Sequence, residues 1–551
     1  MIADSEKIAL IIDDKKITYN ELLKSVTAFS ETLINIKPKD RILIWAENNE
    51  YWIYAFLSIW HQNAIPVPLN NNANQGILHY AINTCLPKYA FVSQKNVEVL
   101  KSIIRSLDNK PEIIVIDDYK NVAIYNKLPA NIKFKSEDTA LITFTAGTTS
   151  FFQKPVMSSF ANIFFNINAY LEINLFSTQD RFLVILSFDH MFPLLNTLIL
   201  PLYIGAIIVF PSSLNPKDIL KTLKNNKVTV ITGVPAVVKN IHNIIMSEIN
   251  ASKLATFLYK LSKKLNNLFV AKLLFRGVYK KIGNSIRFIV CRGIKLDENI
   301  YKGFNVLGIE ILEGYGMIES SVIAFSRLNH NKIGSVGKKV EGTQIKILDG
   351  EIVVRSPCVM QGYYNLPALT SKVLSNGWLS TGDLGTIDSE GYLRILGRKD
   401  ELILMPNGKK VNPYEIEYKL EHYSEFVKEV GVFEEKGKLY ALIVINVDSY
   451  DYLTDKKYKE IKEYNEIRIK NSIKWEVIDE YNQMVSEYKR IKEFYIITDN
   501  LPRNQLGKLK RYELHKLFKS KEKDYYRLID SIENQLDIVE NNEKVHSNTL
   551  I

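Results

Sequence analysis

The stretch that decides the fold is FTAGTTSFFQK, which spans residues 144–154. The preceding apolar run, ALITF at 140–144, predicts a buried strand, and Gly147 permits a tight turn after it. Hydroxyl groups in this turn come from four residues: Thr145, Thr148, Thr149 and Ser150. Successive backbone N–H groups in such a turn form an anion-binding nest, and Lys154 adds a positive charge. The Walker A pattern does not fit, and taken alone the stretch is better read as a polar turn than as a phosphate loop.

The size and composition of the chain limit what this segment can belong to. With 551 residues, 46% hydrophobic and 24% charged, the chain predicts a globular protein of two or more domains. The net charge of +10 suits nucleic acid, anionic lipid, nucleotides or an acidic carrier protein. Because no zinc-finger, RNP or helix-turn-helix signature is present, we expect no nucleic-acid partner, while a peripheral membrane contact stays open.

The cysteines and apolar runs indicate the compartment. Cys85, Cys291 and Cys358 lie far apart, which predicts neither a metal site nor a disulfide and favours a reducing compartment. The N-terminus has acidic residues and no signal-peptide pattern. The longest apolar run, at 198–211, is shorter than the roughly 20 residues of a spanning helix and reads as a buried helix followed by a strand. A soluble, cytoplasmic protein is therefore expected.

The first 400 residues alternate helical patterns, such as 19–36, with short apolar strand patterns. These strands are expected at 41–46, 113–117, 181–186, 206–210, 228–233, 286–291 and 309–316. The alternation predicts an α/β fold with a large N-terminal domain, residues 1–397, of mixed and mainly parallel sheets. Within it, 340–397 predicts an antiparallel subdomain with hairpin turns at Asp349-Gly350 and Glu390-Gly391.

The remainder of the chain predicts a smaller unit and a tail. Residues 398–515 are expected to form a small α+β C-terminal domain, in which 453–493 is long, polar and helical in pattern. Residues 516–551 are expected to form a helical and polar tail. No internal repeats are found.

Further motifs follow the opening stretch in a recognisable order. They are ILEGYGMIESS at 311–321, SVG at 335–337 with GEIVVRSPCVMQGYYN at 350–365, WLSTGDLGTIDSEGYLRILGRKDELI at 378–403 and LPRNQLGKLKRYEL at 501–514. Together they resemble the motifs of adenylate-forming enzymes, which include acyl-CoA synthetases, fatty acyl-AMP ligases and the adenylation domains of peptide synthetases. The resemblance covers residues 17–514. Segments 274–296, 407–417 and 482–496 are most similar to long-chain fatty acyl-CoA synthetases.

The resemblance implies a role for each matching residue in the nucleotide site. Thr145, Gly147, Thr148 and Thr149 match the loop around the β- and γ-phosphates of ATP, with Lys154 as its cation. Gly314, Tyr315 and Gly316 match the turn against adenine, although Tyr315 could equally be a packing aromatic. Glu319 matches the ligand of Mg²⁺, a metal that prefers carboxylate oxygens.

Other matching residues concern the ribose, the hinge, the catalytic step and the acid. Asp383 matches the ribose-binding carboxylate, Arg398 a second ribose or phosphate contact, and Asp400 the hinge. Lys508 matches the catalytic lysine that neutralises the transition state between carboxylate and α-phosphate. His190 lies in a segment that resembles the border of the acyl pocket, although a lone histidine is often structural.

Several positions depart from the family pattern. The loop runs from Ser150 to Pro155 with one residue inserted, and Ala146 replaces a usual serine. Ile318 replaces a threonine beside Glu319 and cannot donate a hydrogen bond. Cys291-Arg292-Gly293 replaces a glycine-rich adenine contact, and Lys295 replaces its proline.

Two classes of function remain after these observations. The first is an acid–thiol ligase that activates a medium- or long-chain fatty acid with ATP and Mg²⁺. It would pass the acyl group to coenzyme A or to the phosphopantetheine of a free-standing acyl carrier protein. The second, motivated by Ile318 and the altered loop, is a pseudo-ligase that binds nucleotide or acyl chain without turnover. An amino-acid adenylating enzyme lacks support, although Asp189 leaves that reading open.

Overall fold

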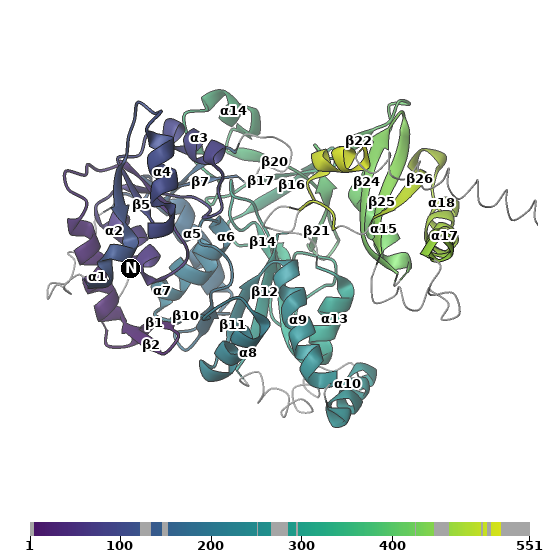
Figure 1. The fold of residues 1–551 in the computed structure, drawn as a ribbon, viewed down its shortest axis with the longest axis horizontal. Coiled ribbons are helices and arrows are strands. Elements are labelled where there is room, and N and C mark those ends of the chain that lie inside the picture. Colours follow the sequence, from purple (N-terminus) through teal and green to yellow (C-terminus); the bar gives the residue numbers. More distant parts are fainter. Residues whose placement is uncertain are drawn as a thin grey trace, which may run out of the picture. The chain divides into compact units, whose positions relative to one another are not determined.

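The computed structural model describes residues 5–121, 134–145, 153–250, 252–265, 285–293, 296–424, 426–445, 462–497, 500–503 and 509–519. Contacts divide them into two compact units (Figure 1). The first unit holds the described residues before Leu396 apart from Gly382–Leu384, and the second holds Gly382–Leu384 and the described residues from Leu396 on. Lys508, Gly147, Thr148 and Thr149 lie outside the described residues.

The first unit is built on a nine-stranded sheet. Its parallel strands are β13 (Glu310–Tyr315), β12 (Phe288–Arg292), β11 (Val230–Gly233), β9 (Arg181–Leu183), β10 (Ile207–Phe210) and β1 (Ile8–Ile12), in that spatial order. The antiparallel strands β14 (Ala324–Phe325) and β15 (Lys338–Lys339) extend one edge, and β2 (Lys15–Thr18) extends the other. The predicted mainly parallel α/β architecture is confirmed.

Three further sheets accompany it. A parallel sheet has the order β4 (Ile65–Pro68), β3 (Arg41–Trp45), β5 (Tyr89–Val92), β6 (Glu112–Val115). Strands β18 (Gly362–Tyr363), β8 (Pro155–Ser159) and β7 (Thr139–Phe144) form an antiparallel sheet. The last sheet contains β16 (Gln344–Leu348), β17 (Glu351–Arg355), β20 (Trp378–Ile387) and β19 (Leu374–Ser375), and β21 (Leu393–Arg398) pairs with β20.

Helices of the first unit lie between and outside these strands. They are α1 (Tyr19–Glu31), α2 (Glu50–His61), α3 (Gln75–Cys85), α4 (Val97–Ile104), α5 (Phe160–Glu172), α6 (Met191–Pro193), α7 (Leu200–Ile204), α8 (Pro216–Asn225), α9 (Pro235–Asn250), α10 (Lys253–Leu265), α13 (Glu298–Val306) and α14 (Pro367–Val373). Helix α1 begins with a capping box between Thr18 and Glu21 and ends at Glu31, five residues before its predicted end.

Alternating side chains of the large sheet build two cores. In β12, Phe288 and Val290 belong to a core that includes α1, α2 and α5, whereas Ile289 belongs to a core with α8, α9 and α13. Each face is apolar because parallel strands covered by helices are buried on both sides. This explains the continuous apolar runs in the sequence. The run at 198–211 forms α7 followed by β10, as predicted.

The hairpin turn predicted at Asp349-Gly350 lies between two paired strands. Strands β16 and β17 are antiparallel, and Asp349 and Gly350 between them have φ values of 50° and 80°. Two positive φ angles characterise the predicted hairpin turn. All three cysteines are buried and free. No helix among the described residues is both long and apolar enough to cross a bilayer.

The second unit is α+β. Strands β24 (Val427–Glu435), β25 (Lys438–Ile445) and β26 (Ile491–Ile497) form its sheet, and β22 (Ile403–Leu404) pairs with β23 (Lys410–Val411). Helical segments are α15 (Pro413–Tyr423), α17 (Lys462–Ile473), η6 (Lys474–Asp479), α18 (Glu480–Gln483) and residues 511–519.

The predicted helix over 453–493 is wrong at its C-terminal end. The helical stretch ends at Gln483, and β26 begins at Ile491 and pairs in parallel with β25. Ile491, Tyr495 and Ile497 are buried while Lys492 and Glu493 are exposed. This pattern of burial suits a strand, and pairing with β25 outweighs the helical propensity of the charged residues before it.

Candidate active site

The base of the predicted phosphate loop is a hydrogen-bonded hairpin. Strands β7 and β8 are antiparallel, with Phe144 opposite Pro155. The Thr145 N–H donates to the Lys154 carbonyl at 3.0 Å, and the Lys154 N–H donates to Thr145 Oγ1 at 3.0 Å. These two bonds hold together the ends of the segment that contains Gly147, Thr148 and Thr149, which itself lies outside the described residues.

Lys154, Tyr363 and Glu319 form one cluster. Lys154 Nζ lies 5.2 Å from the centroid of the Tyr363 ring, a cation–π distance. The Tyr363 hydroxyl donates to Glu319 Oε1 at 2.9 Å, and both side chains are buried. Three of the sequence motifs thus meet here, from residues 144–154, 311–321 and 350–365. We call these three residues the Lys154 cluster.

Tyr363 was not singled out in the sequence. It lies in a Gly-Tyr-Tyr run beside Tyr364, and nothing in the sequence separates a buried hydrogen-bonding tyrosine from a packing one. Its place is fixed by β18, whose Tyr363 pairs with Val156 of β8. That pairing carries Tyr363 to the end of β8 that Lys154 precedes.

The Lys154 cluster provides one buried carboxylate for a metal. Among the described residues, no group of three His, Cys, Asp or Glu side chains could hold an ion on its own. Mg²⁺ that binds with nucleotide phosphates needs only one or two protein carboxylates, because phosphates and water complete its shell. Glu319, with Tyr363 orienting one of its oxygens, fits that requirement.

Gly314 in β13 and Gly316 directly after it lie where other parts of the chain come very close to the backbone. A Cβ on Gly316 would lie 1.4 Å from the Ser321 carbonyl oxygen, and one on Gly314 would lie 2.7 Å from the Phe325 ring. Tyr315 is buried and packs with Ile323. The sequence therefore turns tightly here around two positions that only glycine fills without displacement.

Ile318 is partly buried and packs against the core of the large sheet and against the cluster around Met360 and Tyr363. The threonine of the family pattern is thus replaced by an apolar contact, and the hydrogen bond of that threonine is lost.

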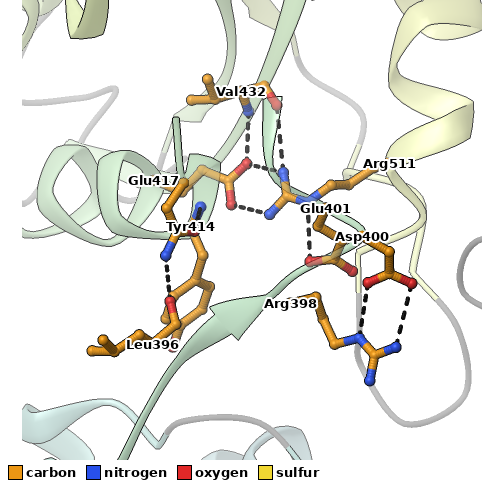
Figure 2. A network of polar contacts seen from close by, with 9 residues as sticks. Leu396, Arg398, Asp400, Glu401, Tyr414, Glu417, Val432 and Arg511 are labelled. Carbon is orange, nitrogen blue, oxygen red and sulfur yellow. Dashed lines mark hydrogen bonds and ion pairs between the residues drawn. The ribbon is translucent and has the colours of Figure 1, made fainter. Parts of the chain in front are cut away.

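The second unit brings together three predicted residues. Arg398 Nη1 donates to Asp383 Oδ1 at 2.9 Å, and its Nε donates to Asp400 Oδ1 at 3.0 Å (Figure 2 shows the Asp400 pair). Burial favours the neutral guanidine, but the two carboxylates outweigh it and hold the pKa of Arg398 above its ordinary value. Arg398 therefore links the predicted ribose-binding residue to the predicted hinge residue.

A neighbouring network anchors the segment after Lys508. Arg511 forms a bidentate pair with the buried Glu417, at 2.5 and 2.6 Å, and its Nε lies 3.4 Å from Glu401 Oε2 (Figure 2). Glu417 also accepts from the Val432 N–H at 2.7 Å. Nothing in the sequence distinguishes this pair, because Arg511 is one of many lysines and arginines near the end of the chain.

His190 lies directly before α6, in the first unit. Its Nε2 is 3.6 Å from Asp189 Oδ2, and Asp189 accepts from Asn70 Nδ2 at 3.3 and 3.4 Å. Asp189, which left the amino-acid reading open, is thus engaged by neighbouring protein side chains. Met191, Leu194 and other apolar residues that follow His190 belong to the large core.

Comparisons with known proteins agree with this geometry. A family model described as AMP-binding enzyme matches residues 3–364, and one described as AMP-binding enzyme C-terminal domain matches residues 400–530. The chain is 25% identical to the long-chain-fatty-acid–CoA ligase FadD15 of Mycobacterium bovis, over 79% of this chain and 78% of that protein. It is 24% identical to the 2-succinylbenzoate–CoA ligase of Bacillus subtilis, over 92% of this chain and 95% of that protein.

Solved structures share the fold. ATP-bound MatB from Rhodopseudomonas palustris matches with a TM-score of 0.76 and 22% identity, over 94% of this chain and 97% of that chain. O-succinylbenzoate coenzyme A synthetase (MenE) from Bacillus subtilis, in complex with ATP and magnesium ion, matches with a TM-score of 0.71 and 23% identity, over 93% and 97%. The predicted fold and resemblance are confirmed, and this chain belongs to the AMP-binding enzyme family.

Proposed function

We propose that the protein activates a carboxylic acid with ATP and transfers the acyl group to a thiol. The observation that carries this proposal is the Lys154 cluster, in which three of the sequence motifs meet around a buried carboxylate. A cation and a metal-binding carboxylate in one place suit the polyphosphate of a nucleotide. The relatives, which are named as acid–CoA ligases, support the same reaction.

In the first half-reaction a carboxylate oxygen attacks the α-phosphorus of ATP. The bond to the β-phosphate oxygen breaks, so acyl-AMP forms and pyrophosphate leaves. Lys154 and the loop hydroxyls would bind the β- and γ-phosphates, and Glu319 would hold the Mg²⁺ that neutralises part of their charge. Gly314, Tyr315 and Gly316 would lie against adenine, and Asp383, oriented by Arg398, would bind the ribose.

In the second half-reaction a thiol attacks the acyl carbon. The carbon–sulfur bond forms, the bond to the phosphate oxygen breaks, AMP leaves and the thiol proton passes to solvent. Lys508 would serve the first half-reaction, with Asp400 as the hinge between the proposed domains 1–397 and 398–515. Coenzyme A is the proposed acceptor, and phosphopantetheine on a free-standing carrier protein is the alternative.

The proposed acid, following the sequence prediction, is a medium- or long-chain fatty acid. The resemblance to long-chain fatty acyl-CoA synthetases and the relative FadD15 support it. The apolar residues after His190 suit an acyl chain but are equally suited to core packing. The proposed location is the cytoplasm, in keeping with three free cysteines.

The test is acid-dependent ATP–pyrophosphate exchange with fatty, aryl and amino acids. Exchange should require Mg²⁺ and fall on the order of 10²–10³-fold in Lys508→Ala, because one preorganised charge is lost from the transition state. Lys510→Ala is the matched control, since Lys510 Nζ pairs with Glu513 at 3.2 Å and has no assigned role. Nucleotide binding without exchange for any acid would instead establish the pseudo-ligase.

A further inference from the structure

Arg292, the last residue of β12, is a buried cation that the proposed mechanism does not use. Only 6% of its surface is exposed. Its Nη2 donates to the Ser321 carbonyl at 2.7 Å, and its Nη1 lies 3.5 Å from the Tyr170 hydroxyl. The guanidinium carbon lies 4.9 Å from the centroid of the Phe192 ring. All three contacts are with neutral groups.

This environment differs from that of the other enclosed arginines. Arg398 pairs with Asp383 and Asp400, and Arg511 pairs with Glu417 and Glu401. Arg292 is more deeply buried than either, yet within the described part of the chain no Asp or Glu forms an ion pair with it. A guanidinium stays charged and has five N–H donors, of which Ser321 and Tyr170 engage two.

Burying a charge without an ion partner is unfavourable, because the charge loses its hydration. A bound anion would offset this loss at Arg292. A purely structural role would be to cap the Ser321 carbonyl. That role needs one neutral donor and does not account for a charged side chain with free donors. The chemistry of the site therefore points to an anionic ligand group.

Arg292 contacts both segments that the proposed function assigns to substrates. A Cβ on Gly316, in the adenine-side turn, would lie 2.3 Å from Arg292 Nη2. Phe192, on the other side, lies two residues after His190 in the segment proposed to border the acid. An anion on Arg292 would thus lie between the adenine-side turn and the segment proposed to border the acid.

We infer that the acid activated by this protein carries a second carboxylate, which binds Arg292, and this narrows the proposed fatty acid to a dicarboxylic acid. The inference rests on the proposed function. The reacting carboxylate is a poorer partner for Arg292 than a second carboxylate. An ion pair with the reacting carboxylate would stabilise the ground state, and it would be lost when the acyl phosphate bond forms. A second carboxylate keeps its charge throughout and matches the planar guanidinium in a bidentate pair.

The experiment compares acids of equal length with one or two carboxylates, from four to twelve carbons, in ATP–pyrophosphate exchange. The wild-type protein should exchange faster with the dicarboxylic acid of at least one pair. In Arg292→Gln, kcat/KM for that acid should fall on the order of 100-fold, while the monocarboxylic acid is unaffected or improved. Arg292→Lys should recover part of the loss. Arg327→Gln, an exposed arginine of the same unit, is the matched control.

Three outcomes would overturn the inference. The first is a wild-type preference for monocarboxylic acids, which needs no variant and so is independent of folding. The second is an equal loss for both acids in Arg292→Gln, which would place the reacting carboxylate or the α-phosphate on Arg292. The third is no change in Arg292→Gln.

Thermal shift with the dicarboxylic acids separates this inference from the proposed function. If no acid supports exchange but the dicarboxylic acid stabilises the wild-type protein and not Arg292→Gln, the anion site stands and the ligase activity fails. If monocarboxylic acids alone support exchange, the ligase stands and the anion site fails.

Discussion

Replacing Tyr363 by phenylalanine isolates one hydrogen bond in the Lys154 cluster. The substitution keeps the ring beneath Lys154 and removes the hydroxyl that donates to Glu319 at 2.9 Å. Glu319 is 6% exposed, so water replaces the lost donor poorly. A hydrogen bond to a charged group contributes about 1.5–3 kcal/mol, and we expect Tyr363→Phe to lower the free energy of unfolding by that amount.

The matched control is Tyr392→Phe. Tyr392 is also buried, its ring also lies beside lysines, and its hydroxyl donates at 3.2 Å to the neutral carbonyl of His330. The expected loss there is about 0.5–1.5 kcal/mol. For a unit of roughly 390 residues, the entropy of unfolding is near 0.8 kcal/mol per degree, so Tm should fall by about 2–4 °C in Tyr363→Phe and by about 1–2 °C in the control.

Thermal denaturation with and without MgATP provides the readout for function. If Glu319 binds Mg²⁺, the metal takes over as its charged partner, and the difference in Tm between Tyr363→Phe and wild type should narrow when MgATP is present. The difference for Tyr392→Phe should stay constant. Equal losses in the two variants, unaffected by MgATP, would refute the reasoning that Tyr363 serves an ionised, metal-binding Glu319.

Arg511→Ala leaves Glu417 buried without its cation and should lower the unfolding free energy of the second unit by about 3–5 kcal/mol in urea. Gly316→Ala should destabilise by about 1–3 kcal/mol or more through contact with the Ser321 carbonyl, whereas Gly76→Ala, in ordinary contact, should not. Burial raises the pKa of Glu421 to about 7. This folded-state pKa lies above the unfolded value, so the free energy of unfolding falls as pH rises from about 4.5 to 7. Thermal melts at pH 5 and pH 8 measure this decrease. In Glu421→Gln the decrease should be smaller by about 1–3 kcal/mol.

The family and most of the strands along the chain could be predicted from the sequence, because motifs and apolar runs are local patterns. Apolar runs such as 286–291 are buried on both faces in parallel sheets, and this leaves a continuous signature. The strand at 491–497 was missed because its pairing with β25 joins segments far apart in sequence, while its charged neighbours favour a helix. Local pattern carries no information on such a partner.

Some features of the candidate site could likewise be predicted from the sequence, and others could not. The order of the motifs carries the resemblance to adenylate-forming enzymes, and that resemblance indicated Glu319, Lys154 and Arg398 as site residues. It did not show that Tyr363 orients Glu319, or that Arg292 is buried without an ion pair to any Asp or Glu that the structure describes.

The sequence by itself therefore determined the family, the α/β architecture and the residue types available for phosphate and metal binding. Only the tertiary structure decided which charged side chains have partners. Tyr363 and Glu319 are 44 residues apart in the chain, and Arg292 and Tyr170 are 122 apart. Burial and pairing are set by strands and helices that bring such distant residues together, and an ion pair acts through distance in space rather than along the chain.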